Sequence, residues 1–166
     1  LSALASELKR ALADELPLVA TQGGIIREGY DPVLDRLRSE ASDARSLVLA
    51  MESRERDRTG IANLRVGYNR VFGYYLEVTR SQLGRVPPDY VRRQTLTGAE
   101  RFVTPELARM EERIEASSTE SHRLETEHFQ RLRERAMRSM AEIQSAARVL
   151  AELDLYLVPP IILRVL

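Results

Sequence analysis

Apolar residues recur at helical spacing in both flanks of the chain and at strand spacing in its middle. In residues 31–60 they advance by steps of three and four, the heptad pattern of a helix that packs along one partner helix. These positions are Leu34, Leu37, Ala41, Ala44, Val48 and Met51. Residues 105–156 resume the pattern and contain no glycine or proline after Pro105. The sequence predicts two long helices, the second uninterrupted, each opened by a cap-then-proline pair, Asp31-Pro32 and Thr104-Pro105.

Between these helices, residues 61–104 alternate apolar and polar side chains with the period of two that marks strands. Segments 64–69 and 74–79 flank a short connection, which indicates a hairpin. From their pattern we predict a third strand over residues 90–96 and a fourth over residues 100–103. Simple alternation places Arg92 and Arg93 on opposite faces of the third strand. Tyr68 and Tyr74 fall on the apolar face, where we expect core packing rather than stacking on bases.

The two ends of the chain complete the outline. Residues 1–16 carry leucines at helical spacing up to Pro17, and residues 18–30 predict an irregular crossing with a short extended piece. Residues 157–166 form an atypical apolar tail in which Pro159-Pro160 cannot continue a helix. The predicted fold class is mainly α with a small inserted antiparallel β-sheet (α+β). In this fold a long antiparallel helix pair carries a roughly four-stranded sheet at its tip.

Charge changes this picture because it is unevenly distributed. The chain has 25 basic and 25 acidic residues and a net charge of zero. Residues 61–103 nevertheless hold seven arginines against three acids, an excess of four positive charges. A basic sheet on acidic helices is the distribution expected where only the sheet meets a polyanion. The arginine- and glutamate-rich run 51–58 predicts an exposed ladder of charge on a helix.

Several classes of function receive no support from the residues. The chain has no cysteine, which excludes disulfides and thiolate metal sites. No signal peptide or membrane-spanning run is evident, so we expect a cytosolic protein without a membrane role. Glu125 and His128 form half of a di-iron pattern. The second half is missing, which favours a solvated helix face. No phosphate-binding loop, nucleophile–base set or complete metal set is present, so we expect no catalysis.

Two long motifs, GIANLRVGYNRVFGYYLEVTRS and RRQTLTGAERFVTPEL, with IREGYDPVLDRLR upstream and ALAELD downstream, resemble the MutS family of bacterial DNA mismatch-repair proteins. The resemblance covers about residues 25–154. It implies that residues 31–60 and 105–156 are lever helices, that 61–104 is a clamp domain, and that 1–30 belongs to a helical core. It further implies sequence-independent binding to the backbone of double-stranded DNA.

The resemblance also sets expectations for the whole protein. Family members are ATPases that use ATP and Mg²⁺, but this chain lacks the phosphate-binding loop and the Phe-x-Glu wedge of the family. We therefore expect no cofactor in this segment. The full-length protein is expected to be a cytoplasmic, nucleoid-associated homodimer that other mismatch-repair proteins bind.

Motif match and charge together nominate five residues for contact with the DNA backbone: Asn69, Arg70, Arg92, Arg93 and Thr97. Arginine suits this task because its planar fork can donate two hydrogen bonds to one phosphate. Thr97-Gly98 departs from the Lys-Asn that family members often have at this turn. In the competing interpretation, Arg92 or Arg93 pairs with Glu77 or Glu100 inside the sheet. The competing function is a coiled-coil spacer or dimerisation module with no role on nucleic acid.

Overall fold

The computed structural model describes residues 1–19 and 23–157. Its internal contacts divide the chain into two compact units. Residues 31–123 form the sheet-bearing unit. Residues 1–30 and those from 124 onward form a second unit, called the helical unit because its described elements are helices. Most of the predicted tail, residues 158–166, lies outside the described residues.

The helices of the sheet-bearing unit begin and end where the sequence signals predict. Helix α2, Pro32–Thr59, is capped by Asp31, whose side chain accepts a 2.7 Å hydrogen bond from the amide of Val33. It ends at Gly60, which has a φ of 67°, a left-handed conformation that favours glycine. Helix α3, Pro105–Arg138, follows Thr104, whose hydroxyl accepts a bond from the amide of Leu107.

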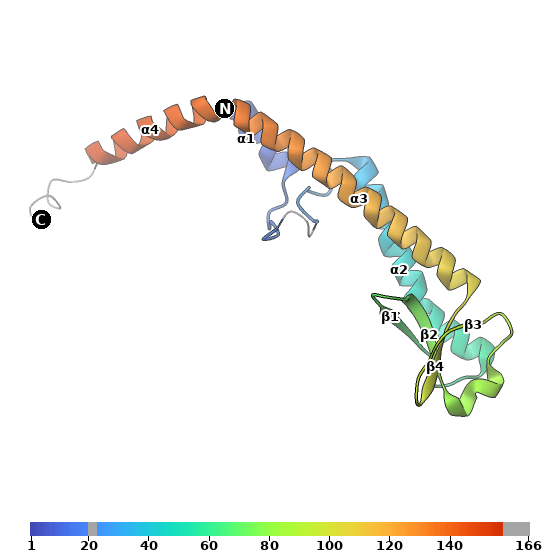
Figure 1. The fold of residues 1–166 in the computed structure, drawn as a ribbon. Helices are drawn as coiled ribbons and strands as arrows, with labels where there is room; N and C mark the ends of the chain where they lie inside the picture. The colour runs from blue at the N-terminus through green and yellow to red at the C-terminus, as the bar shows by residue number, and fades with distance from the viewer. Residues whose placement is uncertain (20–22, 158–166) are drawn as a thin grey trace, which may run out of the picture. The chain divides into compact units, whose positions relative to one another are not determined.

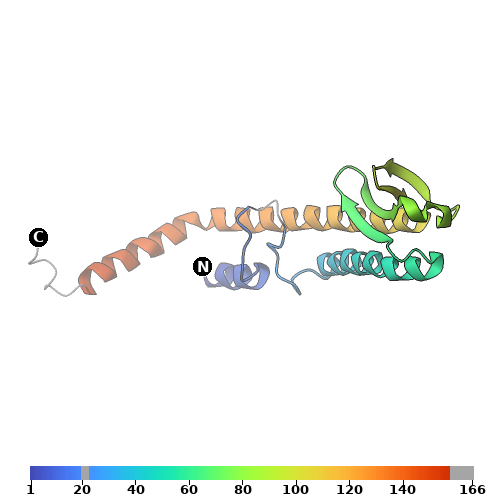
Figure 2. The same ribbon diagram turned by 90° about the horizontal axis from the view of Figure 1, so that it is seen from below.

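Helix α2 and the first part of α3 lie side by side in opposite directions (Figures 1 and 2). Their direction follows from the contacts, because Arg54 bonds to Glu106 near the sheet whereas Glu40 bonds to Ser117 further along. The heptad seam of α2 is almost fully enclosed. Its buried residues are Leu34, Ala41, Ala44, Val48, Met51 and Glu55.

Four antiparallel strands gather against the end of this pair where α2 finishes and α3 begins (Figure 1). They are β1 (Arg65–Asn69), β2 (Gly73–Thr79), β3 (Val91–Thr95) and β4 (Ala99–Val103). Their order in the sheet is β1-β2-β4-β3. A 3₁₀ helix, Arg80–Arg85, lies in the connection between β2 and β3. The structure thus confirms the predicted class, a mainly helical chain with a small inserted antiparallel sheet.

One face of the sheet packs on both helices and forms the core of the unit. Leu76 and Val78 of β2 are fully buried with Phe102 of β4, against Met51 of α2 and Leu107 of α3. Burying each of these large side chains contributes roughly 1.5–3 kcal/mol. Tyr74 packs at the margin of this core, but Tyr68 is largely exposed, so its predicted place in the core was wrong. Its ring contacts that of Tyr74 with centroids 4.9 Å apart.

Side chains of α2 contact the start of β1 along its outer edge. Glu52 accepts a 2.9 Å hydrogen bond from the amide of Val66, while Arg56 donates to the carbonyl of Leu64 and pairs with Glu52. These contacts satisfy backbone groups that an edge strand would otherwise offer to another chain.

In the helical unit, the first helix is shorter than predicted. Helix α1 spans Ser2–Ala11, so it ends well before Pro17. Leu12 is extended and pairs with Ile26, because the amide of Ala13 bonds to Ile25 and that of Arg27 bonds to Ala11. The backbone after Ala11 thus bonds to the 25–27 segment instead of continuing the helix. That segment is the short extended piece expected in 18–30.

The predicted single helix over 105–156 is divided in two at Ser139. Helix α4, Met140–Leu157, follows α3 after this one residue. The amide of Ser139 is shared between the carbonyls of Arg135 and Ala136, a three-centre bond common at helix termini. The prediction of an uninterrupted helix was wrong because it relied on proline and glycine as the only breakers.

Candidate nucleic-acid interface

The sheet-bearing unit exposes arginines on several of its elements. Arg65 of β1, Arg70 in the following turn and Arg80 of the 3₁₀ helix are exposed, and none forms an ion pair with a described residue. Arg85 is also exposed but donates to the carbonyl of Gly60. The positive excess of residues 61–103 is therefore partly available at the surface.

The structure places Asn69 and Arg70 together at one end of the sheet. Asn69 is the last residue of β1, and its side-chain oxygen accepts a 2.8 Å bond from the amide of Val71. That contact is an Asx-type turn, which gives Asn69 a structural role in shaping the hairpin. Arg70 is exposed next to it.

Thr97 lies at the other end. It is exposed in the turn between β3 and β4, next to Gly98, whose carbonyl accepts from the amide of Arg80. Thr79 pairs with Ala99 at the end of the sheet that carries Thr97, whereas Gly73 pairs with Asn69 at the opposite end of the sheet. Gly73 and Thr79 are six positions apart along β2, which is about 20 Å of strand. The five predicted residues are thus not one cluster.

Arg92 and Arg93 do not simply alternate, because β3 carries a β-bulge. Arg92 pairs with Phe102 and Gln94 with Arg101, which leaves Arg93 as the extra residue. The guanidinium of Arg92 lies 2.8 Å from the carboxylate of Glu100, so the competing interpretation of an ion pair is confirmed for this residue.

Arg93 is exposed and faces a carboxylate of α3. Burial raises the pKa of Glu111, and the positive charge of Arg93 partly opposes that rise. Glu111 also accepts a 3.0 Å bond from the amide of Tyr74. Gly73 has a φ of 74°, which favours glycine, and a side chain there would displace the carboxylate of Glu111.

Arg101 contributes to the formal charge of the sheet but is not available at the surface. It donates to Glu77 at 2.9 Å and to Gln94 at 2.9 Å, and its guanidinium stacks 4.2 Å from the ring centroid of Tyr75. Sequence reasoning counted Arg65 and Arg80 as charges but did not nominate them as contacts. Their exposure is the signal that distinguishes them, and a linear motif does not show it.

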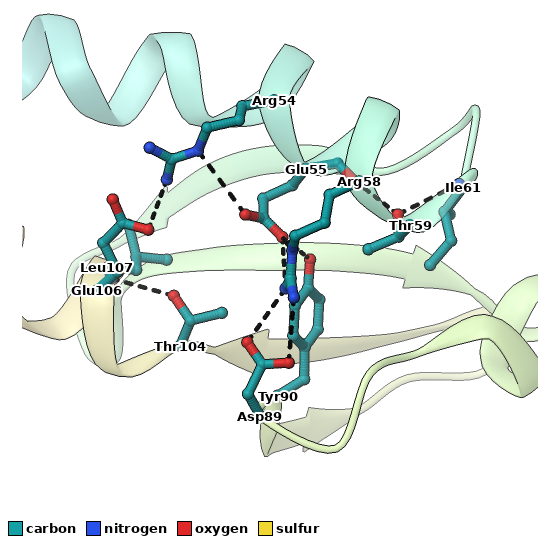
Figure 3. A network of polar contacts seen from close by, with 10 residues as sticks. All are labelled: Arg54, Glu55, Arg58, Thr59, Ile61, Asp89, Tyr90, Thr104, Glu106 and Leu107. Atoms are coloured by element: carbon teal, nitrogen blue, oxygen red, sulfur yellow. Dashed lines mark hydrogen bonds and ion pairs between the residues drawn. The ribbon is translucent and has the colours of Figure 1, made fainter.

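A polar joint fastens the sheet to both helices (Figure 3). At its centre Glu55 of α2 is 4% exposed, so the predicted solvated charge ladder was wrong at this position. Its carboxylate accepts from the hydroxyl of Tyr90 at 2.9 Å and from Arg58 at 2.8 Å. Arg58 also pairs with Asp89, and Arg54 reaches across to Glu106 at the start of α3.

The joint shifts the titration of two of its members. Burial and the hydrogen bond to Glu55 raise the pKa of the Tyr90 hydroxyl. The hydrogen bond to Glu55 is the main cause that raises the pKa of Arg58, already a permanent cation. Both groups therefore keep their protons, which maintains the contacts of Asp89 and Tyr90, just before β3, with α2.

In the helical unit, Glu125 and His128 are both buried, so the expected solvated face was wrong for these residues. Glu125 accepts hydrogen bonds from the amides of Gly24 and Ile26 at 3.0 and 3.3 Å. His128 packs edge-on against Tyr30, with ring centroids 5.4 Å apart. No group of three or more metal-ligating side chains is present among residues 1–19 and 23–157.

Hydropathy adds one observation. Within the part of the chain that the structure describes, no helix has the length and apolar character needed to cross a bilayer.

The fold and the distribution of its cations define a class of protein: an antiparallel helix pair that carries a small, arginine-bearing sheet. The family model for MutS family domain IV matches residues 29–120, which include this sheet, helix α2 and the first part of α3. This chain belongs to the MutS family.

Curated relatives extend the match beyond that domain. The DNA mismatch repair protein MutS of Thermus aquaticus is 48% identical over 156 residues, which is 94% of this chain and 19% of that protein. The protein of the same name from Symbiobacterium thermophilum is 47% identical over 147 residues, 89% of this chain and 17% of the relative. The chain therefore spans less than a fifth of the length of these relatives.

Proposed function

We propose that the sheet of this chain binds the backbone of double-stranded DNA without reading its sequence. The observation that carries the proposal is the match to MutS family domain IV over a unit that exposes Arg65, Arg70 and Arg80, none of which forms an ion pair within the described residues. Cations that meet phosphates supply most of the affinity in non-specific DNA binding. Asn69, Arg70, Arg92, Arg93 and Thr97 remain the proposed contacts, and exposure adds Arg65 and Arg80 to them.

Two ends of one sheet can contribute to such binding in different ways. Asn69 and Arg70 lie at the hairpin, whereas Thr97 lies beside Arg80. Contacts to a phosphate backbone can be spread over this distance, because successive phosphates repeat along the duplex and carry no sequence information. A specific base contact would instead need convergent side chains in one groove.

The whole protein extends the proposal. Its relatives are named DNA mismatch repair proteins, so we propose that this chain serves mismatch repair as a clamp on lever helices, in the cytoplasm and on the nucleoid. ATP hydrolysis with Mg²⁺, homodimer formation and contact with other repair proteins would belong to the remainder of such a protein. Movement of the levers by those distant domains would open or close the clamp.

The spacer alternative receives less support, because α2 does not offer its seam to another chain. The seam residues Ala44, Val48 and Met51 are buried in the core of their own unit. A dimer that formed through α2 would have to displace α3.

Fluorescence anisotropy with a labelled duplex tests the proposed function. We expect weak binding with no preference between matched and mismatched duplexes, and an affinity that falls as salt rises, by a log–log slope of about −0.9 for each phosphate neutralised. Arg70→Glu should weaken binding to all sequences alike. Arg113→Glu, on an exposed position of α3, is the matched control. An affinity that does not change between low and high salt would contradict the proposal.

A further inference from the structure

Arg92 and Glu100 form an unequal ion pair. The Glu100 side chain is enclosed, with only 10% of its surface exposed, whereas the Arg92 side chain is 63% exposed. The contact joins the Nε atom of Arg92 to a carboxylate oxygen of Glu100, as an ion pair rather than a well-aligned hydrogen bond. Within the described residues, the two terminal nitrogens of Arg92 donate no hydrogen bond.

Arg101 on the neighbouring strand shows the opposite arrangement. Its Nε and one terminal nitrogen are both engaged, its plane covers Tyr75, and its side chain is only 20% exposed. Arg101 is therefore part of the sheet, whereas Arg92 has one side held and the other open to solvent.

The anchor of Arg92 is costly to abandon. A buried carboxylate that loses its cation is strongly disfavoured, so an Arg92 side chain that swung away would leave Glu100 uncompensated. A guanidinium can meet two anions at once, because Nε and the terminal nitrogens point in different directions in one rigid plane. An ammonium group is a point charge and lacks this division.

We propose that Glu100 is a positioning residue that holds Arg92 by Nε and presents its terminal nitrogens to a phosphate of the DNA backbone. This inference rests on the proposed function and assigns a role to a residue that would otherwise only subtract positive charge from the interface. Holding the side chain in place before binding reduces the conformational entropy lost on contact. This smaller entropy loss favours binding and offsets the electrostatic repulsion between Glu100 and the phosphate.

The two effects of Glu100 can be separated by a double-mutant cycle with Arg92, measured by duplex anisotropy at several salt concentrations. Arg92→Gln should weaken binding and reduce the magnitude of the salt slope by about 1. Glu100→Gln should weaken binding roughly threefold while Arg92 is present. In the Arg92→Gln background the same change should leave affinity unchanged or raise it, because only repulsion remains to be removed.

Arg92→Lys sharpens the test, because it should reverse the direction in which Glu100→Gln changes the affinity for DNA. A lysine has one nitrogen for both anions and no rigid plane that separates its donors, so Arg92→Lys should bind more weakly, and adding Glu100→Gln should restore affinity. Glu77→Gln is the matched control, since it removes a negative charge from the same sheet but faces Arg101. It should not weaken binding. Glu100→Asp keeps the charge while shortening its reach, and it replaces the Gln variant if hydrogen exchange shows that the latter is unfolded.

The outcomes discriminate between this inference and the function on which it rests. If the unmodified chain shows no salt-dependent binding, the proposed function fails and the positioning role fails with it. If it binds, but Glu100→Gln changes affinity by the same factor with arginine, lysine or glutamine at position 92, the positioning role is wrong and the proposed function stands.

Discussion

Each of the two units contains a buried glutamate on a helix, and these two glutamates, Glu55 and Glu125, bind different kinds of partner. Glu55 in the sheet-bearing unit meets side chains, the hydroxyl of Tyr90 and the guanidinium of Arg58. Glu125 in the helical unit meets backbone, the amides of Gly24 and Ile26. Glu55 therefore fastens the residue just before β3 to α2 through side chains, whereas Glu125 fixes the backbone of a segment that has no regular structure of its own.

The difference shows that a buried carboxylate can stabilise a fold in two ways, by fixing the position of a sheet on its helices or by accepting hydrogen bonds from backbone amides. A sheet that has satisfied its own backbone still needs a fixed position on its helices, and side-chain contacts supply it. A crossing segment such as 23–27 has backbone amides that need acceptors, and a carboxylate with two oxygens can satisfy more than one. Substitutions that remove each carboxylate should therefore loosen different parts of the chain.

The largest effect is expected for Glu55→Ala. It leaves the Tyr90 hydroxyl without its acceptor and Arg58 with Asp89 alone, so the sheet-bearing unit should lose about 3 kcal/mol, the lower end for a broken buried pair. Hydrogen exchange read by region measures this loss, since two units need not unfold together. Protection should fall in β3 and the end of α2 but not in residues 124–132.

The control for this substitution is Glu112→Ala, which removes an exposed carboxylate from α3. Its effect should stay within about 0.5 kcal/mol. A Glu55→Ala variant as stable as this control would show that the joint does not hold the sheet.

Glu125→Ala should have a smaller effect, confined to the other unit. The amides of Gly24 and Ile26 lose their hydrogen bonds to this carboxylate, but Gly24 is exposed and water can replace the carboxylate there. We expect a loss of about 2 kcal/mol, mainly from the buried amide of Ile26. Exchange should accelerate in residues 24–27 while β2 and β4 stay protected. Equal acceleration in both units would contradict a local role.

Tyr90→Phe removes one contact of the joint and adds a dependence on pH. At neutral pH the variant should be less stable by about 1 kcal/mol, one net hydrogen bond. The raised pKa of Tyr90 means that, above about pH 10, the unfolded chain releases this proton while the folded chain keeps it. Stability contributed by the hydroxyl is therefore present below that pH and lost as pH rises toward the folded pKa.

The measurement is the stability of β3, taken by urea titration with regional exchange at pH 7, 9 and 10.5. The difference between the parent chain and Tyr90→Phe should shrink from pH 9 to 10.5. Tyr68→Phe is the control, because Tyr68 is 59% exposed and lies outside the joint. A constant difference would indicate that Tyr90 titrates in the folded chain as it does in the unfolded one.

Much of the fold could be predicted because local signals and tertiary structure agree. Asp31-Pro32 and Gly60 bound α2, and the alternation over 64–69 and 74–79 identifies the hairpin. The bulge at Arg93 could not be predicted, because one extra residue in a five-residue strand does not visibly change the alternation of apolar and polar side chains. The break at Ser139 had no proline or glycine to reveal it.

The burial of Glu55 and Glu125 could have been predicted from helical periodicity, but their charge favoured an exposed position. Glu55 falls four residues after Met51, which is the next position of the α2 seam, and it is buried like the seam residues before it. Glu125 lies four residues after Ser121 and three before His128, all of which are buried on one face of α3. Periodicity therefore predicts their burial, whereas their charge favoured exposure. The proposed contacts Asn69, Arg70, Arg93 and Thr97 depend instead on the surface of a partner, which the pattern of one chain does not specify.

The smallest effect is expected at the rim of the joint, between Arg54 and Glu106. The two side chains approach to 2.6 Å, but they are 52% and 41% exposed, so water and salt screen their attraction. A double-mutant cycle with alanine at each position should give a coupling of about 0.5 kcal/mol, and 1 M salt should reduce it further. A coupling above about 2 kcal/mol would mean that the rim is as desolvated as Glu55. In that case the joint would depend on a continuous charged network rather than on one buried carboxylate, and Glu55→Ala alone would underestimate its strength.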